Sequence, residues 1–283
     1  MIRLFLIALF LLLGCSIEKE TTYAPVSEEF LLSNKKGLGL GSKEAFEEQK
    51  KQIQDSMPLE IKLKKSGIVF RLIPKGKFKM GSQPDEAGKL VDQKIEVINK
   101  PFYIGKFEVS QKQWTAVMGK NSSVFKGENN PVENINWHEC QLFLKKLGDL
   151  EGADYKFSLP TEIEWEYACR AGSIETFTYG LSLSSKQANF IGTEPYDAEQ
   201  GPDLKRTCSV GQYQDNAWGL FDVHGNVAEF CQNTYLFGEE RVAVTKGGSW
   251  QDTGAACKSS TSSFQILKDK SNRVGFRIKL TRR

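Results

Sequence analysis

The sequence predicts an α+β fold with little regular secondary structure. Apolar residues recur at three- and four-residue spacing in two segments, which indicates amphipathic helices, and many short segments have the composition of strands. Neither an internal repeat nor a βαβ alternation is present. The chain of 283 residues is 40% hydrophobic and contains 18 Phe, enough to bury a sizeable core. We expect one folded domain over residues 60–283.

The first 14 residues differ from the rest and predict a signal peptide. A positive start at Arg3 precedes an apolar run of ten residues, Leu4 to Leu13, which is about half the length that crosses a bilayer. The run ends in Gly14-Cys15, which resembles the bacterial lipobox. We expect cleavage before Cys15 and lipidation of its thiol, the alternative being an ordinary signal peptide with a chance Cys. Ser16 favours the outer over the inner membrane of a bacterial envelope.

Residues 15–59 are expected to form a polar tether between the lipid and the domain, with a short exposed helix beginning at Ser42. The whole chain has a formal charge of +3, and the chain without residues 1–14 loses only Arg3 among its charged residues. A nearly neutral protein does not favour charge-driven docking on anionic lipid, so membrane attachment would depend on the acyl chains. No block of basic residues interleaves with aromatics, which argues against a nucleic-acid partner.

Turn residues and changes in periodicity divide the domain into elements. Thr161 followed by Glu164 has the spacing of a capping box at a helix start. The elements expected in chain order are two or three strands within 61–82, a strand over 102–109, a helix over 110–118, a helix over 137–150, a helix after Thr161, loops over 177–237, and strands within 241–250 and 273–280.

Six segments in the same order resemble the formylglycine-generating enzyme (sulfatase-modifying factor) family. They are Phe78–Ser82, Ile104–Trp114, Pro131–Trp137, Leu159–Gly172, Gly219–Phe230, and Gly247–Trp250 with Asn272–Arg277. The resemblance covers the chain from Phe78 to Arg277. It implies an irregular α+β fold related to C-type lectins.

The resemblance also bears on catalysis. In the oxidases of this family two thiols follow a Gly-Gly-Ser motif, bind Cu(I) and oxidise a substrate cysteine to formylglycine. Here Ser249 keeps the motif, Asp252 stands at the first thiol position and Cys257 at the second. A carboxylate is a hard ligand that suits Cu(I) poorly, so we expect neither copper binding nor a catalytic residue at these positions.

Five cysteines remain after Cys15, and an oxidising compartment favours pairing some of them. The resemblance to non-oxidase family members implies a disulfide between Cys231 and Cys257. Cys140 and Cys169 lie on expected amphipathic helices and are interpreted as buried apolar residues. The pairing of Cys208 is left open.

Family members hold structural Ca²⁺ in loops, and the resemblance implies two candidate pairs of ligands here. Asn189 and Asp203 match one site, and Asn226 and Glu229 match the other. Calcium takes about six to eight oxygen ligands, which loops rich in Asn, Asp and Gly can supply. The alternative is that these side chains stabilise turns by hydrogen bonds without a metal.

Two classes of function are therefore weighed. The first is a membrane-anchored recognition or scaffold module that docks on another envelope protein or complex. The second is an oxidase that converts a sulfatase cysteine to formylglycine through a modified thiol site. Asp252 favours the first. The chain has only two histidines, His138 and His224, which excludes a three-histidine iron or zinc site.

Overall fold

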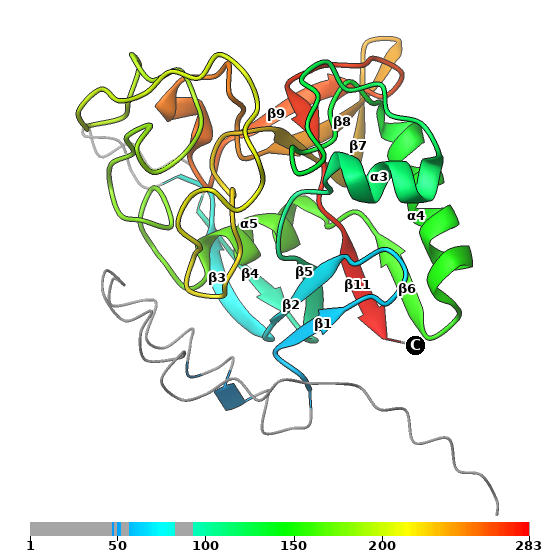
Figure 1. Cartoon of the computed structure of the whole chain (residues 1–283). Helices are drawn as coiled ribbons and strands as arrows, with labels where there is room; N and C mark the ends of the chain where they lie inside the picture. The colour runs from blue at the N-terminus through cyan, green and yellow to red at the C-terminus, as the bar shows by residue number, and fades with distance from the viewer. Residues whose placement is uncertain (1–46, 48–49, 52–56, 83–92, 283) are drawn as a thin grey trace, which may run out of the picture.

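The computed structural model describes residues 47, 50–51, 57–82 and 93–282 (Figure 1). It confirms the α+β expectation, because the residues described from 57 onward form three sheets of short strands, three α-helices and one 3₁₀ helix. The expected signal peptide, Cys15 and most of the tether lie outside the described residues. Within the expected tether helix, Glu47, Lys50 and Lys51 are helical. Among the described helices none combines the length and hydropathy needed to cross a bilayer.

The largest sheet has five strands in the order β1-β2-β5-β11-β6, and every neighbouring pair is antiparallel. Its strands are β1 Glu60–Lys62, β2 Val69–Ile73, β5 Phe102–Gly105, β6 Tyr155–Ser158 and β11 Lys279–Arg282. The strands expected within 61–82 are confirmed as β1, β2 and β3 (Gly76–Met80), and β3 forms a separate two-stranded ribbon with β4 (Lys94–Ile98).

A second sheet of four strands has the order β10-β7-β8-β9. Its strands are β7 Ala228–Phe237, β8 Glu240–Lys246, β9 Ser262–Ile266 and β10 Val274–Gly275. The chain passes from β10 in this sheet to β11 in the five-stranded sheet within four residues, so the segment 273–280, expected to be strand, contains β10 and the start of β11. The residues between the two strands, Phe276 to Ile278, are buried where the sheets meet.

The three helices begin at capping boxes, in which the side chain before the helix and the third residue within it bond each other's backbone. They are α3 Gln111–Met118 after Ser110, α4 Trp137–Glu151 after Asn136, and α5 Glu162–Arg170 after Thr161. Polar side chains thus satisfy helix-start N–H groups that would otherwise lack partners. All three expected helices are confirmed.

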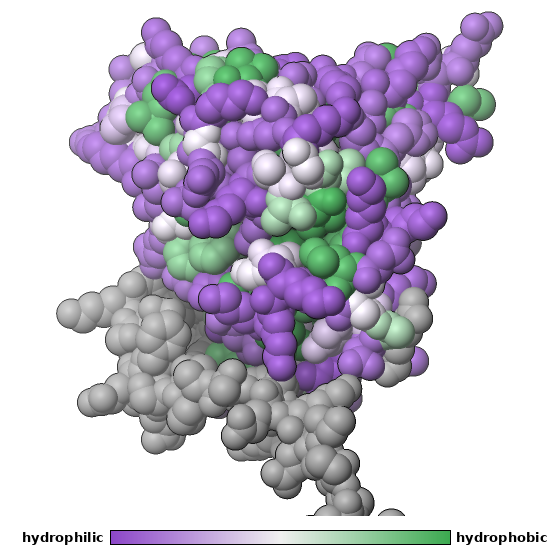
Figure 2. Space-filling model, turned by 45° about the vertical axis from the view of Figure 1, so that its right-hand side comes forward, coloured by the Kyte–Doolittle hydropathy of each residue, from purple (hydrophilic) through white to green (hydrophobic). Residues whose placement is uncertain are grey.

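The hydrophobic core lies between the helices and the sheets. Trp114 of α3 stacks on Phe143 of α4 with ring centroids 5.3 Å apart, and Phe276 meets Phe143 edge-on. Such aromatic pairs add to the stability that comes from apolar burial. Hydrophilic side chains cover most of the face in Figure 2, and a band of hydrophobic residues crosses its middle.

Strand β7 lies in a region that the sequence predicted to be loop. Its inner residues Phe230 and Cys231 are followed by the polar run Gln232–Thr234, where the pairing with β8 is interrupted. A register irregularity of this kind removes the strict alternation on which strand prediction depends. The strand expected over 102–109 ends at Gly105, because Val109 bonds instead to Val132 and Phe276.

Candidate functional site

The first candidate site is the loop after β8, at the positions of the family's two thiols. Gly247 and Gly248 both have positive φ and turn the chain out of the sheet. The Ser249 hydroxyl donates to Asp252 Oδ2 at 2.6 Å, and Arg273 Nη1 lies 3.7 Å from Asp252 Oδ1. Both carboxylate oxygens of Asp252 therefore have polar partners within the protein.

Cys257 ends the 3₁₀ helix Gly254–Cys257 and is fully buried. It packs in a small cluster with Phe177 and Phe190. A Cβ atom on Gly248 would lie 2.6 Å from Cys257 Sγ, so the loop requires glycine there both for its positive φ and for this close approach.

Burial and, to a smaller extent, the Asp252 carboxylate raise the pKa of the Cys257 thiol well above its usual value. The thiolate is the form that binds soft metals, and Cys257 is held in the neutral form. Nearby His224 does not act as a base for it. Its Nδ1 lies 2.7 Å from the Cys257 carbonyl oxygen, its Nε2 accepts from Thr178 N–H, and burial lowers its pKa to about 4.

The residues do not fit a Cu(I) site of two thiolates, because the first position carries a hydrogen-bonded carboxylate and the second a buried neutral thiol. Across the part of the chain that the structure describes, no three His, Cys, Asp or Glu side chains are grouped so that they could hold a metal ion. The arrangement is that of a hydrogen-bonded turn.

The disulfide expected between Cys231 and Cys257 is wrong for this structure, in which both are free and buried. Cys231 lies on β7 in the cluster that contains Trp165 and Cys169, whereas Cys257 lies in the separate cluster around Phe177. The two thiols are thus held by different parts of the core. Cys140, Cys169 and Cys208 are also free and buried, which agrees with the apolar interpretation of the first two.

The second candidate site surrounds Glu229 on β7. Arg277, from the segment between β10 and β11, donates to both carboxylate oxygens of Glu229 at 2.6 Å, and Trp165 Nε1 donates to one of them at 2.6 Å. Arg277 also donates to the Gly105 and Phe221 carbonyls. All three side chains are buried, so the ion pair joins α5 to both sheets.

Asn226, the other expected ligand of this site, also has hydrogen-bond partners for both polar atoms of its side chain. Its Oδ1 accepts from Cys208 N–H and from Asn189 Nδ2, and its Nδ2 donates to Glu108. Since Arg277 already neutralises Glu229 and the Asn226 oxygen has two donors, the pair does not fit a calcium ion. The oxygens of Asn226 and Glu229 that were expected to bind the metal accept hydrogen bonds and form an ion pair instead.

The remaining expected ligands, Asn189 and Asp203, differ from each other. Asn189 is buried and its Oδ1 has no hydrogen-bond partner among the described residues. Such an orphaned oxygen is a candidate for an unseen cation or water. Asp203 is half-buried and accepts from Lys205 N–H within its own turn. Asn189 thus has one oxygen free to bind a cation, whereas the bond that the structure gives to Asp203 is within its own turn.

A second buried ion-pair network was not predicted from the sequence. Glu166 of α5 accepts from Arg170 and from Lys246 of β8 at 3.0 Å, and Lys246 is almost completely buried. Glu166 and Arg170 are four residues apart on one helix, a spacing typical of ion pairs, so half of this network could have been predicted. Lys246 comes from β8, 80 residues further along the chain, so no local spacing in the sequence predicted its contact with Glu166.

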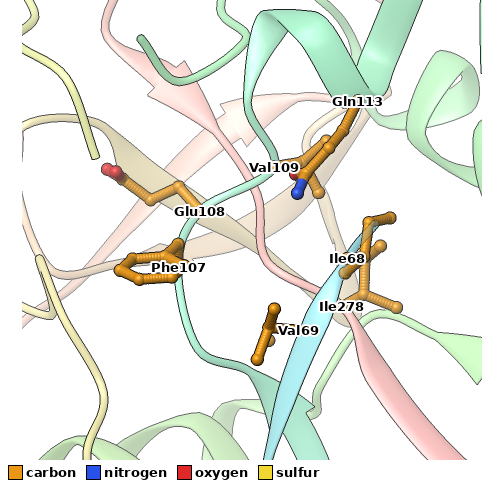
Figure 3. Close-up of a pocket in the computed structure, with 8 residues that line it drawn as sticks. Ile68, Val69, Phe107, Glu108, Val109, Gln113 and Ile278 are labelled. Atoms are coloured by element: carbon orange, nitrogen blue, oxygen red, sulfur yellow. The ribbon is translucent and has the colours of Figure 1, made fainter. Parts of the chain in front are cut away.

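A hollow beside α3 has a volume of about 10 Å³, at the lower limit for one water molecule. Figure 3 shows that Ile68, Val69 and Ile278 lie together there, while the carboxylate of Glu108 points away from them.

Residues 62–281 match the family described as the sulfatase-modifying factor enzyme 1-like domain. The chain belongs to this family. Its fold is the irregular, C-type-lectin-like fold that the sequence predicted. Two solved structures share it at low sequence identity: PvdO from Pseudomonas aeruginosa (TM-score 0.66, 21% identity, 78% of this chain and 97% of that one) and Treponema denticola variable protein 1 (TM-score 0.65, 22% identity, 80% and 100%).

Curated relatives include proteins of different kinds. Chaperone protein LppX of Paenibacillus barcinonensis is 32% identical over 194 residues, which cover 53% of this chain and 69% of LppX. The formylglycine-generating enzyme of Mus musculus is 25% identical over 192 residues, 60% of this chain and 49% of the enzyme. The inactive Cα-formylglycine-generating enzyme 2 of Bos taurus is 26% identical over 148 residues, 51% and 46%. The chain thus spans about half the length of these last two relatives.

Proposed function

We propose that this protein is a lipid-anchored envelope protein whose domain recognises another envelope protein or complex and does not oxidise thiols. The observation that carries the proposal is the closed Ser249–Asp252 turn beside the buried, neutral Cys257. The domain has no pair of thiolates at the family's copper position, so we infer that it acts by binding other molecules through its surface.

The relatives support a family in which catalysis is optional. One is named a chaperone and another an inactive enzyme, while others are named formylglycine-generating enzymes. The alternative function, an oxidase that uses Cys257 alone, is favoured by the retention of that one cysteine. The same experiment tests both.

The experiment is oxidation of a peptide containing Cys-X-Pro-X-Arg in the presence of copper and a reductant, followed by mass spectrometry. We expect no aldehyde above the control without protein. An Asp252→Cys variant tested in parallel measures how much of the metal site one substitution restores. Product formed by the unmodified protein and lost in Cys257→Ala would support the oxidase and contradict the proposal.

The proposed anchor is tested by metabolic labelling with palmitate. We expect the label on the unmodified protein and none on Cys15→Ala, which should also leave the membrane fraction. Absence of label from the unmodified protein would contradict the anchor and leave the proposal for the Ser249–Asp252 turn unaffected.

We further propose that one structural Ca²⁺ binds at Asn189 with the help of Asp203, since the orphaned Asn189 oxygen would gain a partner. A ligand that binds only the folded state raises the melting temperature as its concentration rises. We expect calcium to raise the Tm of the unmodified protein and to have a smaller effect on Asn189→Ala. An unchanged melting curve with calcium or a chelator would contradict the site.

A further inference from the structure

The β3–β4 ribbon has an outer face that no other described element covers. Its register places Lys77 opposite Val97 and Lys79 opposite Ile95. Side chains of such pairs lie on the same face of an antiparallel ribbon. All four are exposed, and Ile95 and Val97 retain 64% and 54% of their accessible surface. The opposite face is turned inward, where Phe78 packs on Tyr167 of α5 with ring centroids 5.2 Å apart.

Lysines are frequent on and beside this ribbon. Its strands and the turns that flank them carry five exposed lysines: Lys75, Lys77, Lys79, Lys94 and Lys100. The acidic residue described within the strands, Glu96, is half-buried and lies 2.7 Å from Lys94. Lys77 and Lys79 lie on the outer face with Ile95 and Val97, whereas Lys94, opposite Met80, lies on the other face with Glu96. The outer face thus carries positive charge beside two exposed aliphatic side chains, although the charge of the whole chain is nearly neutral.

The point at which the tether enters the domain lies beside this ribbon. Leu72 N–H donates to the Leu59 carbonyl at 2.9 Å, and Tyr103 Oη donates to the Pro58 carbonyl at 2.8 Å. Leu72 lies at the end of β2, directly before the turn that leads into β3. Residues 58–59 thus adjoin the end of the ribbon that carries Lys75, and Figure 1 shows β1, β3 and β4 along the same lower edge.

We propose that the outer face of the β3–β4 ribbon adsorbs to the anionic phospholipid surface of the membrane that holds the anchor. Lysines near an anionic bilayer are attracted to it, and the two aliphatic side chains can enter the headgroup boundary. The inference rests on the proposed anchor at Cys15.

The tether makes this weak adsorption effective. In the sequence, 44 positions separate Leu59 from Cys15, so an anchor at Cys15 would keep the domain near the membrane surface. Tethering converts adsorption into an intramolecular step with an effective concentration of about millimolar. Contact at the ribbon would hold the domain in one orientation and leave its other faces open to a partner.

The test is lysine footprinting of the full lipidated protein in vesicles of phosphatidylcholine alone or with one quarter phosphatidylglycerol. An amine-reactive reagent is followed at each lysine by mass spectrometry. We expect Lys77 and Lys79 to react several-fold more slowly on the anionic vesicles at low salt, and this protection to vanish at 1 M NaCl, where the Debye length is about 3 Å. The exposed Lys145 and Lys146 of α4 are the internal control and should react equally on both vesicles.

A charge-reversal pair sharpens the test. Lys77→Glu/Lys79→Glu should abolish the protection of Lys75 and Lys100, whereas Lys145→Glu/Lys146→Glu should preserve it. The ten connecting residues 83–92, which include three acidic residues and one lysine, are left unchanged in both variants. Full protection in the ribbon variant would overturn the assignment to this face.

Three outcomes would count against the inference in different ways. Protein that fails to float with either vesicle contradicts the anchor and, with it, the inference. Protein that floats while its ribbon lysines react equally on both vesicles overturns the inference and leaves the anchor intact. Ribbon lysines that are protected in intact cells but not on anionic vesicles would assign the face to a protein partner instead of lipid.

Discussion

The turn at Asp252 and the buried centre at Glu229 contain the same chemical pair, a carboxylate and an arginine, in opposite surroundings. Asp252 and Arg273 lie 3.7 Å apart with 29% and 47% of their side chains exposed. Glu229 and Arg277 lie 2.6 Å apart with 1% of each side chain exposed. Solvent screens the first pair, and the low-dielectric interior strengthens the second.

The two pairs therefore have different roles: the buried pair stabilises the fold, and the exposed pair lies at the candidate copper position. The buried pair joins two sheets and α5, so its loss would disturb the whole domain. The exposed pair closes a surface turn in which the family's oxidases place a thiol. A carboxylate at Asp252 is compatible with this exposed turn and is a poor ligand for Cu(I).

The largest expected effect is the loss of the buried arginine. Arg277→Met leaves the Glu229 carboxylate buried without its countercharge, which typically costs about 3–5 kcal/mol. The matched control is Arg273→Met, for which exposure predicts a cost of about 1 kcal/mol or less. Chemical denaturation of both variants measures the two costs. Equal losses of unfolding free energy would contradict the contrast between the pairs.

A smaller effect concerns Asp222, whose pKa burial raises to about 6. An unfolded aspartate titrates near 4, so between about pH 4 and 6 the folded state keeps a proton that the unfolded state releases. The stability that this group contributes is therefore present below about pH 4 and is lost as pH rises through 6.

Asp222→Asn cannot ionise and removes this loss. Relative to the unmodified protein, its unfolding free energy should rise between pH 4 and 6 by on the order of 2–3 kcal/mol and then level off. His224, whose pKa is lowered to about 4, has the opposite pH dependence but is present in both proteins and cancels in the difference. A difference that stays constant from pH 4 to 7 would be inconsistent with a buried carboxyl.

An effect of similar size tests the close contact beneath the turn. Gly248→Ala places a Cβ 2.6 Å from Cys257 Sγ at a positive φ, for which we expect a cost of about 2–3 kcal/mol. Gly119→Ala also has a positive φ but meets open space, so it should cost about 1 kcal/mol.

Thermal unfolding of both glycine variants measures the contribution of the contact with Cys257 above that of backbone strain. Cys257→Ala introduced into Gly248→Ala should recover part of the loss, because the sulfur is removed. No recovery, with equal costs at the two glycines, would show that the turn can move away from Cys257.

Local signals predicted the helices well, because the capping box at Thr161 and the apolar spacing of residues 137–150 act within a few turns of chain. They did not predict the pairing of Glu229 with Arg277, whose partners lie 48 residues apart and meet only when two sheets pack. The carboxylate at Asp252 could be found by its position in a motif. The error at Cys231 and Cys257 has the same cause as the missed pair, since sequence order does not report which cluster a side chain enters.

The most direct test of the central claim is a titration of the reduced protein with Cu(I) in competition with a chromophoric chelator. The closed turn and the buried neutral thiol predict that the unmodified protein leaves the chelator spectrum unchanged at equimolar concentration. Withdrawal of one equivalent of Cu(I) by the unmodified protein, abolished by Cys257→Ala, would contradict the account.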